Sequence, residues 1–232
     1  MDYFMNRSVN VFKQIQQTQL VAFLAPKTKE DCLIAYEVMT PLGIVLEVAF
    51  RTEAALEGIQ YTLKKYPDAL LLAGTVMTVK QAKLAIDAGV AGIISADYIA
   101  NVVETCAKQD IMAIPGSLGD VGKQLVQKAE IYNCDLNDLK EKAPYQWIHK
   151  LFPATTQHQS FISVAKAYKA AYKGLQMMYT GGISLDNLES LVEYDPDGIF
   201  CGSAITKQID RPDAMEEEAK RWLHLIGKHT KK

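Results

Sequence analysis

Residues 147–154 read Trp-Ile-His-Lys-Leu-Phe-Pro-Ala, a short apolar run that holds one lysine and closes on a proline. This length and composition predict a buried strand with Lys150 near its end. A lysine that is removed from water acts as a nucleophile toward carbonyl groups, so we expect Lys150 to form an imine with a 2-keto acid. The alternative is an ordinary solvated lysine at the end of a strand.

Short apolar runs of this kind recur along the chain. Most are rich in Ile, Val, Leu or aromatic residues, and they cover residues 20–25, 44–50, 69–74, 91–96, 111–116, 146–152, 175–182 and 197–203. Amphipathic segments with helical spacing lie between several of them, at 28–39, 52–65, 78–88, 97–108 and 184–192. Strand followed by helix eight times predicts an α/β protein with a closed (β/α)8 barrel, the TIM barrel. An open doubly wound sheet is the rival fold, but residues 22–27 carry no GxGxxG motif.

The length of 232 residues suits one domain, so we expect a single barrel domain over residues 1–232. Residues 1–18 precede the first strand and predict an extra helix that caps the bottom of the barrel, with partner binding as the alternative role. The spacing of the runs widens before the sixth, which indicates an insertion at residues 131–145. Residues 212–228 predict a last amphipathic helix, and residues 228–232 a solvated tail.

The overall composition excludes several classes of partner. A formal net charge of −2 gives no basic surface for nucleic acid or an anionic membrane, so any anionic ligand must be held locally. No apolar run approaches the roughly 18 residues of a membrane-spanning helix. The four cysteines are far apart and do not pair with histidines at metal-ligand spacing. We therefore expect a cytoplasmic protein with no metal site, no nucleic-acid partner and no membrane partner.

A carboxylate also stands inside one of the apolar runs. Glu47 lies within residues 44–49 (Ile-Val-Leu-Glu-Val-Ala), where a charge is costly to bury without a partner or a function. A structural ion pair with Arg51 is the alternative explanation. In a barrel the carboxyl ends of the strands converge, so Glu47, Arg51 and Lys150 should meet in one cleft, as ionisable groups of catalytic sites do.

Glycines follow the last two predicted strands. Gly181 and Gly182 end the seventh run, and Gly202 with Ser203 ends the eighth. Barrel enzymes often bind phosphate at this place on backbone N–H groups, and glycine allows the close approach that such binding needs. Ordinary turns are the alternative explanation, since turns also favour glycine.

With these residues together, the chain resembles the aldolases that cleave 2-keto-3-deoxy-6-phosphogluconate (KDPG) and 4-hydroxy-2-oxoglutarate (KHG), a family of lysine-dependent (β/α)8 barrels. The resemblance covers about residues 21 to 205, and its most specific parts are residues 46–52 (Leu-Glu-Val-Ala-Phe-Arg-Thr), 73–76 (Ala-Gly-Thr-Val), 114–116 (Ile-Pro-Gly), 150–154 (Lys-Leu-Phe-Pro-Ala) and 180–183 (Thr-Gly-Gly-Ile). It implies a class I aldolase that works through a Schiff base, uses no cofactor and forms a homotrimer.

The resemblance also implies a role for each site residue. Lys150 would form the imine and Glu47 would move protons. The substrate-binding residues would be Arg51 and Thr75 at the carboxylate, Phe152 as a wall of the pocket, Thr180 at the distal part of the substrate, Gly181, Gly182, Gly202 and Ser203 at the phosphate, and Pro115 as a further contact.

Two departures from the family concern specificity. Residues 95–97 read Ser-Ala-Asp where the family commonly has Ser-Pro-Gly, and the link before Trp147 is longer than usual. The expected substrates are KDPG, which gives pyruvate and glyceraldehyde 3-phosphate, its galactonate epimer, and 4-hydroxy-2-oxoglutarate, which gives pyruvate and glyoxylate. The alternatives are another phosphate-binding barrel enzyme without imine chemistry, and a non-catalytic binder of a phosphorylated acid.

Overall fold

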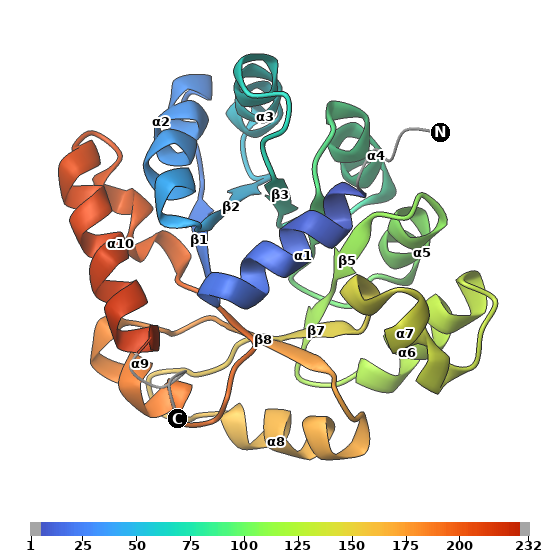
Figure 1. Ribbon diagram of the computed structural model, residues 1–232. Coiled ribbons are helices and arrows are strands. Elements are labelled where there is room, and N and C mark those ends of the chain that lie inside the picture. Colours follow the sequence, from blue (N-terminus) through green and yellow to red (C-terminus); the bar gives the residue numbers. More distant parts are fainter. Residues whose placement is uncertain (1–5, 228–232) are drawn as a thin grey trace.

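A parallel barrel of strands lies at the centre of the molecule, in a computed structural model that describes residues 6–227 (Figure 1). Its strands are β1 (Leu20–Leu24), β2 (Val45–Ala49), β3 (Leu71–Gly74), β4 (Gly92–Ile94), β5 (Met112–Ile114), β6 (Gly116–Ser117), β7 (Ile148–Leu151), β8 (Gln176–Thr180) and β9 (Gly198–Phe200). Each hydrogen-bonded pair is parallel, and the sheet order runs from β5 through β1 to β6. The predicted (β/α)8 barrel is confirmed.

The fifth predicted strand, at residues 111–116, is divided at Pro115 into the two strands β5 and β6. The β5 segment pairs with β4, whereas β6 pairs with β7, so the barrel closes through the proline that joins them. Proline has no backbone N–H to donate to a ladder, and it interrupts strands for that reason. Its carbonyl oxygen still accepts a hydrogen bond from the Lys150 backbone N–H at 3.1 Å.

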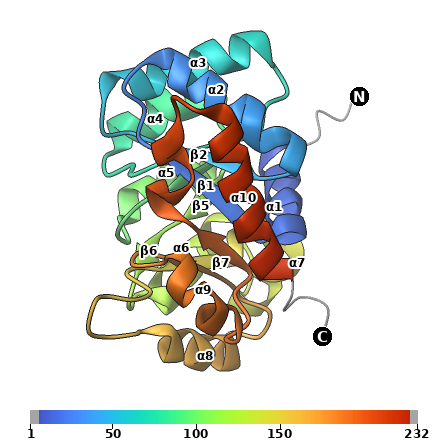
Figure 2. The same cartoon turned by 90° about the vertical axis from the view of Figure 1, so that its left-hand side faces the viewer.

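Helices surround the barrel on its outer side, as the two views in Figure 1 and Figure 2 show. They are α2 (Lys29–Met39), α3 (Glu53–Lys65), α4 (Val79–Ala88), α5 (Ala100–Lys108), α6 (Val121–Ile131), α8 (Ile162–Ala171), α9 (Leu185–Val192) and α10 (Pro212–Gly227). Short 3-10 turns occur at η1 (Thr40–Leu42), η4 (Gly202–Ala204) and η5 (Thr206–Gln208). Thr28 caps α2 in a capping box with Asp31. The predicted tail at 228–232 lies outside the described residues.

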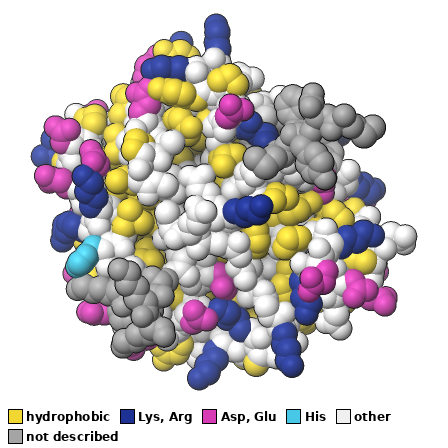
Figure 3. All heavy atoms as spheres, in the orientation of Figure 1, with side chains coloured by type: hydrophobic (Ala, Val, Ile, Leu, Met, Phe, Trp, Pro, Cys, Tyr) yellow, Lys and Arg dark blue, Asp and Glu magenta, His cyan; other side chains and the backbone are white. Residues whose placement is uncertain are grey.

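The first helix, α1 (Arg7–Thr18), crosses the end of the barrel where the strands begin (Figure 1). The Ser8 hydroxyl donates to the carbonyl of Ala91 at 2.8 Å and accepts from the N–H of Met112 at 2.9 Å, just before β4 and at the start of β5. Val11 and Ile15 are fully buried against the strands. Figure 3 views this face, where charges of both signs lie mainly round the rim. Because the strands are parallel, their carboxyl ends lie at the opposite face. Residues 1–5 of the predicted helix lie outside the described residues.

The segment between α6 and β7 contains η2 (Leu136–Asp138), α7 (Leu139–Lys142) and η3 (Pro144–Gln146). Gln146, the last residue of η3, forms hydrogen bonds with backbone groups of and next to β5 that face away from β4. The Gln146 amide donates to the carbonyl of Ile111 at 2.8 Å and accepts from the N–H of Ala113 at 3.2 Å. The Lys128 ammonium, from α6, donates to the carbonyl of Ala113 at 2.8 Å. Side chains thus replace the backbone ladder that the split strand cannot make.

Candidate active site

Lys150 lies near the end of β7 with its side chain almost entirely buried, at 6% exposure. A Cβ on Gly116, its neighbour in register on β6, would lie 2.5 Å from the Lys150 Cε, so a larger residue there would force the lysine side chain to move. The Nζ atom lies 5.1 Å from the centre of the Phe152 ring. Within residues 6–227 it makes no hydrogen bond, which leaves its lone pair available once the proton is lost.

Glu47 lies in the middle of β2 and is 5% exposed. A Cβ on Gly74, at the end of β3, would overlap the Glu47 Oε1, so a second glycine makes room for the carboxyl group. The proposed structural ion pair with Arg51 is not formed, because no ion pair of residues 6–227 joins the two side chains within 4.0 Å. That alternative explanation for a buried glutamate is therefore wrong.

Burial shifts the pKa values of the two groups in the direction of their neutral forms. Burial lowers the pKa of Lys150 to about 8; the Glu47 carboxylate opposes this change and the Arg51 guanidinium adds to it. Burial raises the pKa of Glu47 to about 7, against the opposing effects of Lys150 and then Arg51. Desolvation thus outweighs the attraction between the pair. At neutral pH an appreciable fraction of Lys150 is an uncharged amine, whereas a free lysine would be neutral in about one molecule in 2,500.

Arg51 and Thr75 come together at the mouth of the barrel. The Arg51 Nε donates to the Thr75 hydroxyl at 3.3 Å, and the guanidinium lies 5.2 Å from the centre of the Phe23 ring. Thr75 adopts a left-handed backbone conformation with φ of 55°, which is costly for a β-branched residue and common at functional sites. A guanidinium and a hydroxyl held side by side suit a carboxylate, which accepts several hydrogen bonds at once.

Two glycine corners follow the last strands, Gly181 with Gly182 after β8 and Gly202 with Ser203 after β9, and the first of them lies beside the Phe152 ring. A Cβ on Gly181 would lie 3.1 Å from the Phe152 ring, the same ring that Lys150 faces. Gly181, Gly182 and Gly202 all have positive φ angles, of 86°, 69° and 56°. Ser203 is exposed in η4, and a Cβ on Gly202 would meet nothing within 4 Å, so this corner is open. Thr180 ends β8 and its hydroxyl donates to the carbonyl of Phe200 at 3.5 Å.

Three further residues shape the site, although the sequence analysis gave them no role. Gly74 and Gly116 clear space for the two buried side chains, and Phe23 lies under the guanidinium of Arg51. In the register of β1 with β2, Phe23 lies opposite Glu47. This pairing of neighbouring strands is the signal that could have identified Phe23 as a site residue. A Cβ on Gly116 would also lie 3.0 Å from the carbonyl oxygen of Ser95 and 3.1 Å from that of Ala96. The segment 95–97, whose sequence differs from the common family motif, therefore lies next to Lys150.

Comparison with known proteins agrees with this geometry. The model of the family described as KDPG and KHG aldolase matches residues 11–140, which is more than half of the chain and includes Glu47, Arg51 and Thr75. The chain belongs to this aldolase family. The matched segment ends before Lys150, so the position of the lysine in this aldolase rests on the geometry described above.

Curated relatives span most of the length of this aldolase. The 2-dehydro-3-deoxy-phosphogluconate aldolase of Haemophilus influenzae is 25% identical over 195 residues, covering 84% of each chain. The enzyme of the same name from Treponema pallidum is 26% identical over 197 residues, covering 84% of this chain and 85% of the relative.

Solved structures of related enzymes share the fold of this aldolase. The KDPG aldolase of Legionella pneumophila, with pyruvate captured as a covalent carbinolamine, superposes with a TM-score of 0.72 at 24% identity, covering 92% of this chain and 97% of that one. The KDPG aldolase of Zymomonas mobilis superposes with a TM-score of 0.68 at 22% identity, covering 91% and 94% of the two chains.

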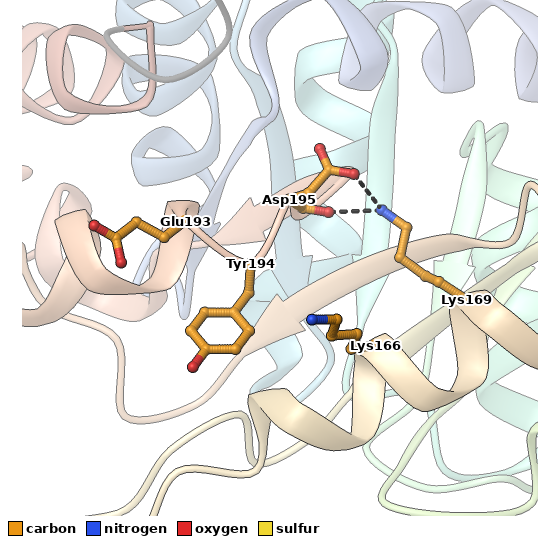
Figure 4. Close-up of a pocket in the computed structure, with 5 residues that line it drawn as sticks. All are labelled: Lys166, Lys169, Glu193, Tyr194 and Asp195. Atoms are coloured by element: carbon orange, nitrogen blue, oxygen red, sulfur yellow. Dashed lines mark hydrogen bonds and ion pairs between the residues drawn. The ribbon is translucent and has the colours of Figure 1, made fainter. Parts of the chain in front are cut away.

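A separate hollow of about 540 Å³ lies between α8 and the segment that follows α9. Figure 4 shows Lys166 and Lys169 on α8 with Tyr194 and Asp195 across from them, and Lys169 pairs with Asp195 at 3.1 Å. None of the site residues lines this hollow.

No helix within residues 6–227 has the length and hydrophobicity needed to cross a membrane.

Proposed function

We propose that this chain is a class I aldolase that cleaves KDPG to pyruvate and glyceraldehyde 3-phosphate through a Schiff base on Lys150. One observation carries the proposal, namely a buried lysine whose Nζ is unpaired within residues 6–227 and whose pKa falls to about 8. At pH 7 such a pKa leaves about one tenth of the molecules with a neutral amine, which is the reactive form.

In the proposed reaction, Arg51 and Thr75 hold the carboxylate of the substrate and so present C2 to Lys150. The neutral amine adds to the C2 ketone, and loss of water gives an iminium ion. The C4 hydroxyl then loses its proton, the C3–C4 bond breaks, and its electron pair moves to the iminium nitrogen to form an enamine. The aldehyde leaves from C4. Because the iminium accepts the electrons, the cleavage needs no metal ion.

Glu47 is the proposed proton carrier of the reaction. Its pKa of about 7 lets it exist in both forms near neutral pH, as a general acid and base must. As a carboxylate it takes the C4 hydroxyl proton, directly or through a water molecule. As a carboxylic acid it returns a proton to C3 of the enamine. Hydrolysis of the resulting iminium then releases pyruvate and restores Lys150.

The open corner at Gly202 and Ser203 supports a phosphorylated substrate. Gly181, Gly182, Gly202 and Ser203 would bind the phosphate of KDPG through backbone N–H groups and a hydroxyl. Cleavage of 4-hydroxy-2-oxoglutarate to pyruvate and glyoxylate uses the same lysine and is a second proposed activity. The galactonate epimer of KDPG stays an alternative substrate.

Assembly as a homotrimer and a cytoplasmic location stay predictions from the sequence.

Trapping the imine tests the proposal. The protein is incubated with pyruvate and sodium borohydride, digested, and examined by mass spectrometry. We expect one reduced pyruvate on Lys150 and none on Lys128, the other buried lysine with a lowered pKa. Lys128→Met serves as the matched control and should still be labelled, whereas Lys150→Met should not. Absence of labelling at Lys150 in the wild-type protein would contradict the proposed function.

A further inference from the structure

A small pocket of about 130 Å³ opens beside the corner formed by Gly202 and Ser203. It lies between the end of β1 and the segment after β9, and β1 and β9 are neighbours in the barrel. The residues that line it are Leu24, Ala25, Lys27, Asp31, Ser203, Thr206, Lys207 and Ile209. Its volume corresponds to about four water molecules at ~30 Å³ each, which is enough for a group of a few heavy atoms.

Two lysines line this pocket, and neither has an ion pair within 4.0 Å among residues 6–227. Lys27 and Lys207 are both exposed, and neither side chain forms an ion pair or hydrogen bond within residues 6–227. They come from different segments, Lys27 from the loop after β1 and Lys207 from η5. Like charges that face a shared hollow repel one another unless an anion lies between them.

The one carboxylate of the pocket is already occupied by other donors. The Asp31 Oδ2 accepts hydrogen bonds from the N–H groups of Lys27 at 2.7 Å and Thr28 at 3.1 Å, and its Oδ1 accepts from the Thr28 hydroxyl at 2.8 Å. Asp31 therefore acts as the cap of α2. Counting two lysines against this one carboxylate, the pocket keeps a net positive charge.

We propose that Lys27 and Lys207 bind the distal phosphate of the substrate and make this chain selective for phosphorylated sugar acids. The proposal rests on the proposed aldolase function and defines its substrate class. Backbone N–H groups at the glycine corners offer hydrogen bonds but no full positive charge, whereas a phosphate carries nearly two negative charges at neutral pH. Because the net charge of the chain is −2, attraction for such a group must come from local cations, and these two lysines supply it.

The test compares two substrates that differ only in the phosphate, KDPG and 2-keto-3-deoxygluconate. We expect Lys27→Met and Lys207→Met each to raise KM for KDPG about tenfold with little change in kcat, because the lost contact binds ground state and transition state alike. The double variant should lose about a hundredfold. For 2-keto-3-deoxygluconate, all three variants should stay within about twofold of the wild-type protein. Lys27→Arg and Lys207→Arg should restore most of the KDPG affinity.

A matched control and a second readout separate this proposal from the aldolase proposal. Lys83→Met removes an exposed lysine of α4, far from the pocket, and should change neither KM. Binding of inorganic phosphate, measured by calorimetry without any turnover, should weaken in the Lys27 and Lys207 variants and not in Lys83→Met. Equal behaviour of the three variants in phosphate binding would overturn the role of the two lysines even if Lys150 is labelled by pyruvate. Equal losses on both substrates would also overturn it.

Discussion

Two buried lysines lie in the described part of this barrel, and they differ in the hydrogen bonds that their amines form. Lys128 is 0% exposed, and its ammonium donates to the carbonyl oxygens of Ala113 at 2.8 Å and Gln146 at 3.0 Å. Lys150 is nearly as buried, but its Nζ makes no hydrogen bond within residues 6–227. Burial lowers both pKa values, to about 7 for Lys128 and about 8 for Lys150.

A lowered pKa therefore does not by itself identify a nucleophile. Lys128 has the lower value, yet its nitrogen is used to complete the hydrogen bonding of the split strand β5. Lys150 packs against Gly116 and faces the Phe152 ring, beside which Gly181 also lies. It is also coupled to the carboxyl group of Glu47, whereas no carboxylate contributes to the pKa of Lys128.

The largest expected effect comes from removing the Glu47 carboxylate, whose charge acts on Lys150 but not on Lys128. We predict that Glu47→Gln lowers kcat/KM for KDPG about a thousandfold, the range lost with a general acid or base. Pyruvate should still be trapped on Lys150. The pH midpoint of trapping should move to lower pH, because the Glu47 carboxylate raises the pKa of Lys150 and its removal lets that pKa fall. Glu57→Gln, an exposed glutamate of α3, is the control. An unchanged or higher midpoint would contradict the coupling.

A second prediction concerns the space that Lys150 occupies. In Gly116→Ala the new Cβ would lie 2.5 Å from the Lys150 Cε, so the side chain must move. We expect kcat to fall by about a hundredfold per folded molecule, since a displacement near 1 Å at a reacting group costs about this much. Gly119→Ala is the control, because its Cβ meets nothing within 4 Å. Equal kcat values for the two variants would show that Lys150 needs no such clearance. Thermal melting reports any loss of stability separately.

The smallest expected effect sharpens the description of Lys128. The lysine of the unfolded chain keeps its proton to about pH 10, whereas the folded one loses it near pH 7. Between these values the unfolded state binds more protons, so stability rises with pH. We predict that the unfolding free energy of the wild-type protein, relative to Lys128→Met, increases by about 2 kcal/mol from pH 7 to pH 9. Urea denaturation at three pH values measures this change, and Lys83→Met should match the wild-type slope.

Much of the barrel could be predicted because its signals are local. Apolar runs separated by amphipathic segments give the order of strands and helices, and Thr28 with Asp31 marks the start of α2 through a side chain only three residues away. The split at Pro115 was missed because the apolar run continues through it, and only the hydrogen-bond ladder reveals the change of partner from β4 to β7. The start of α5 was placed three residues early for a similar reason, since Asp97 accepts a hydrogen bond from the N–H of Tyr98 in a turn.

The candidate site divides in the same way. Lys150, Glu47 and the glycine corners could be selected from the sequence, because a charge or a glycine pair inside an apolar run is conspicuous, and their roles stay predictions. Gly74, Gly116 and Phe23 could not be selected, since each matters only through a residue on a neighbouring strand. The two lysines of the small pocket come from opposite ends of the chain and meet only because β1 lies beside β9.

The sequence by itself determined the alternation of strands and helices, from which a closed barrel was predicted, and the presence of one lysine and one glutamate where charges are costly. Those features depend on residues close together in the chain. Only the tertiary structure decided which buried lysine forms hydrogen bonds, which direction each pKa moves, and which cations lie near Ser203. These properties depend on burial and on distances between residues far apart in sequence, and only the folded barrel sets them.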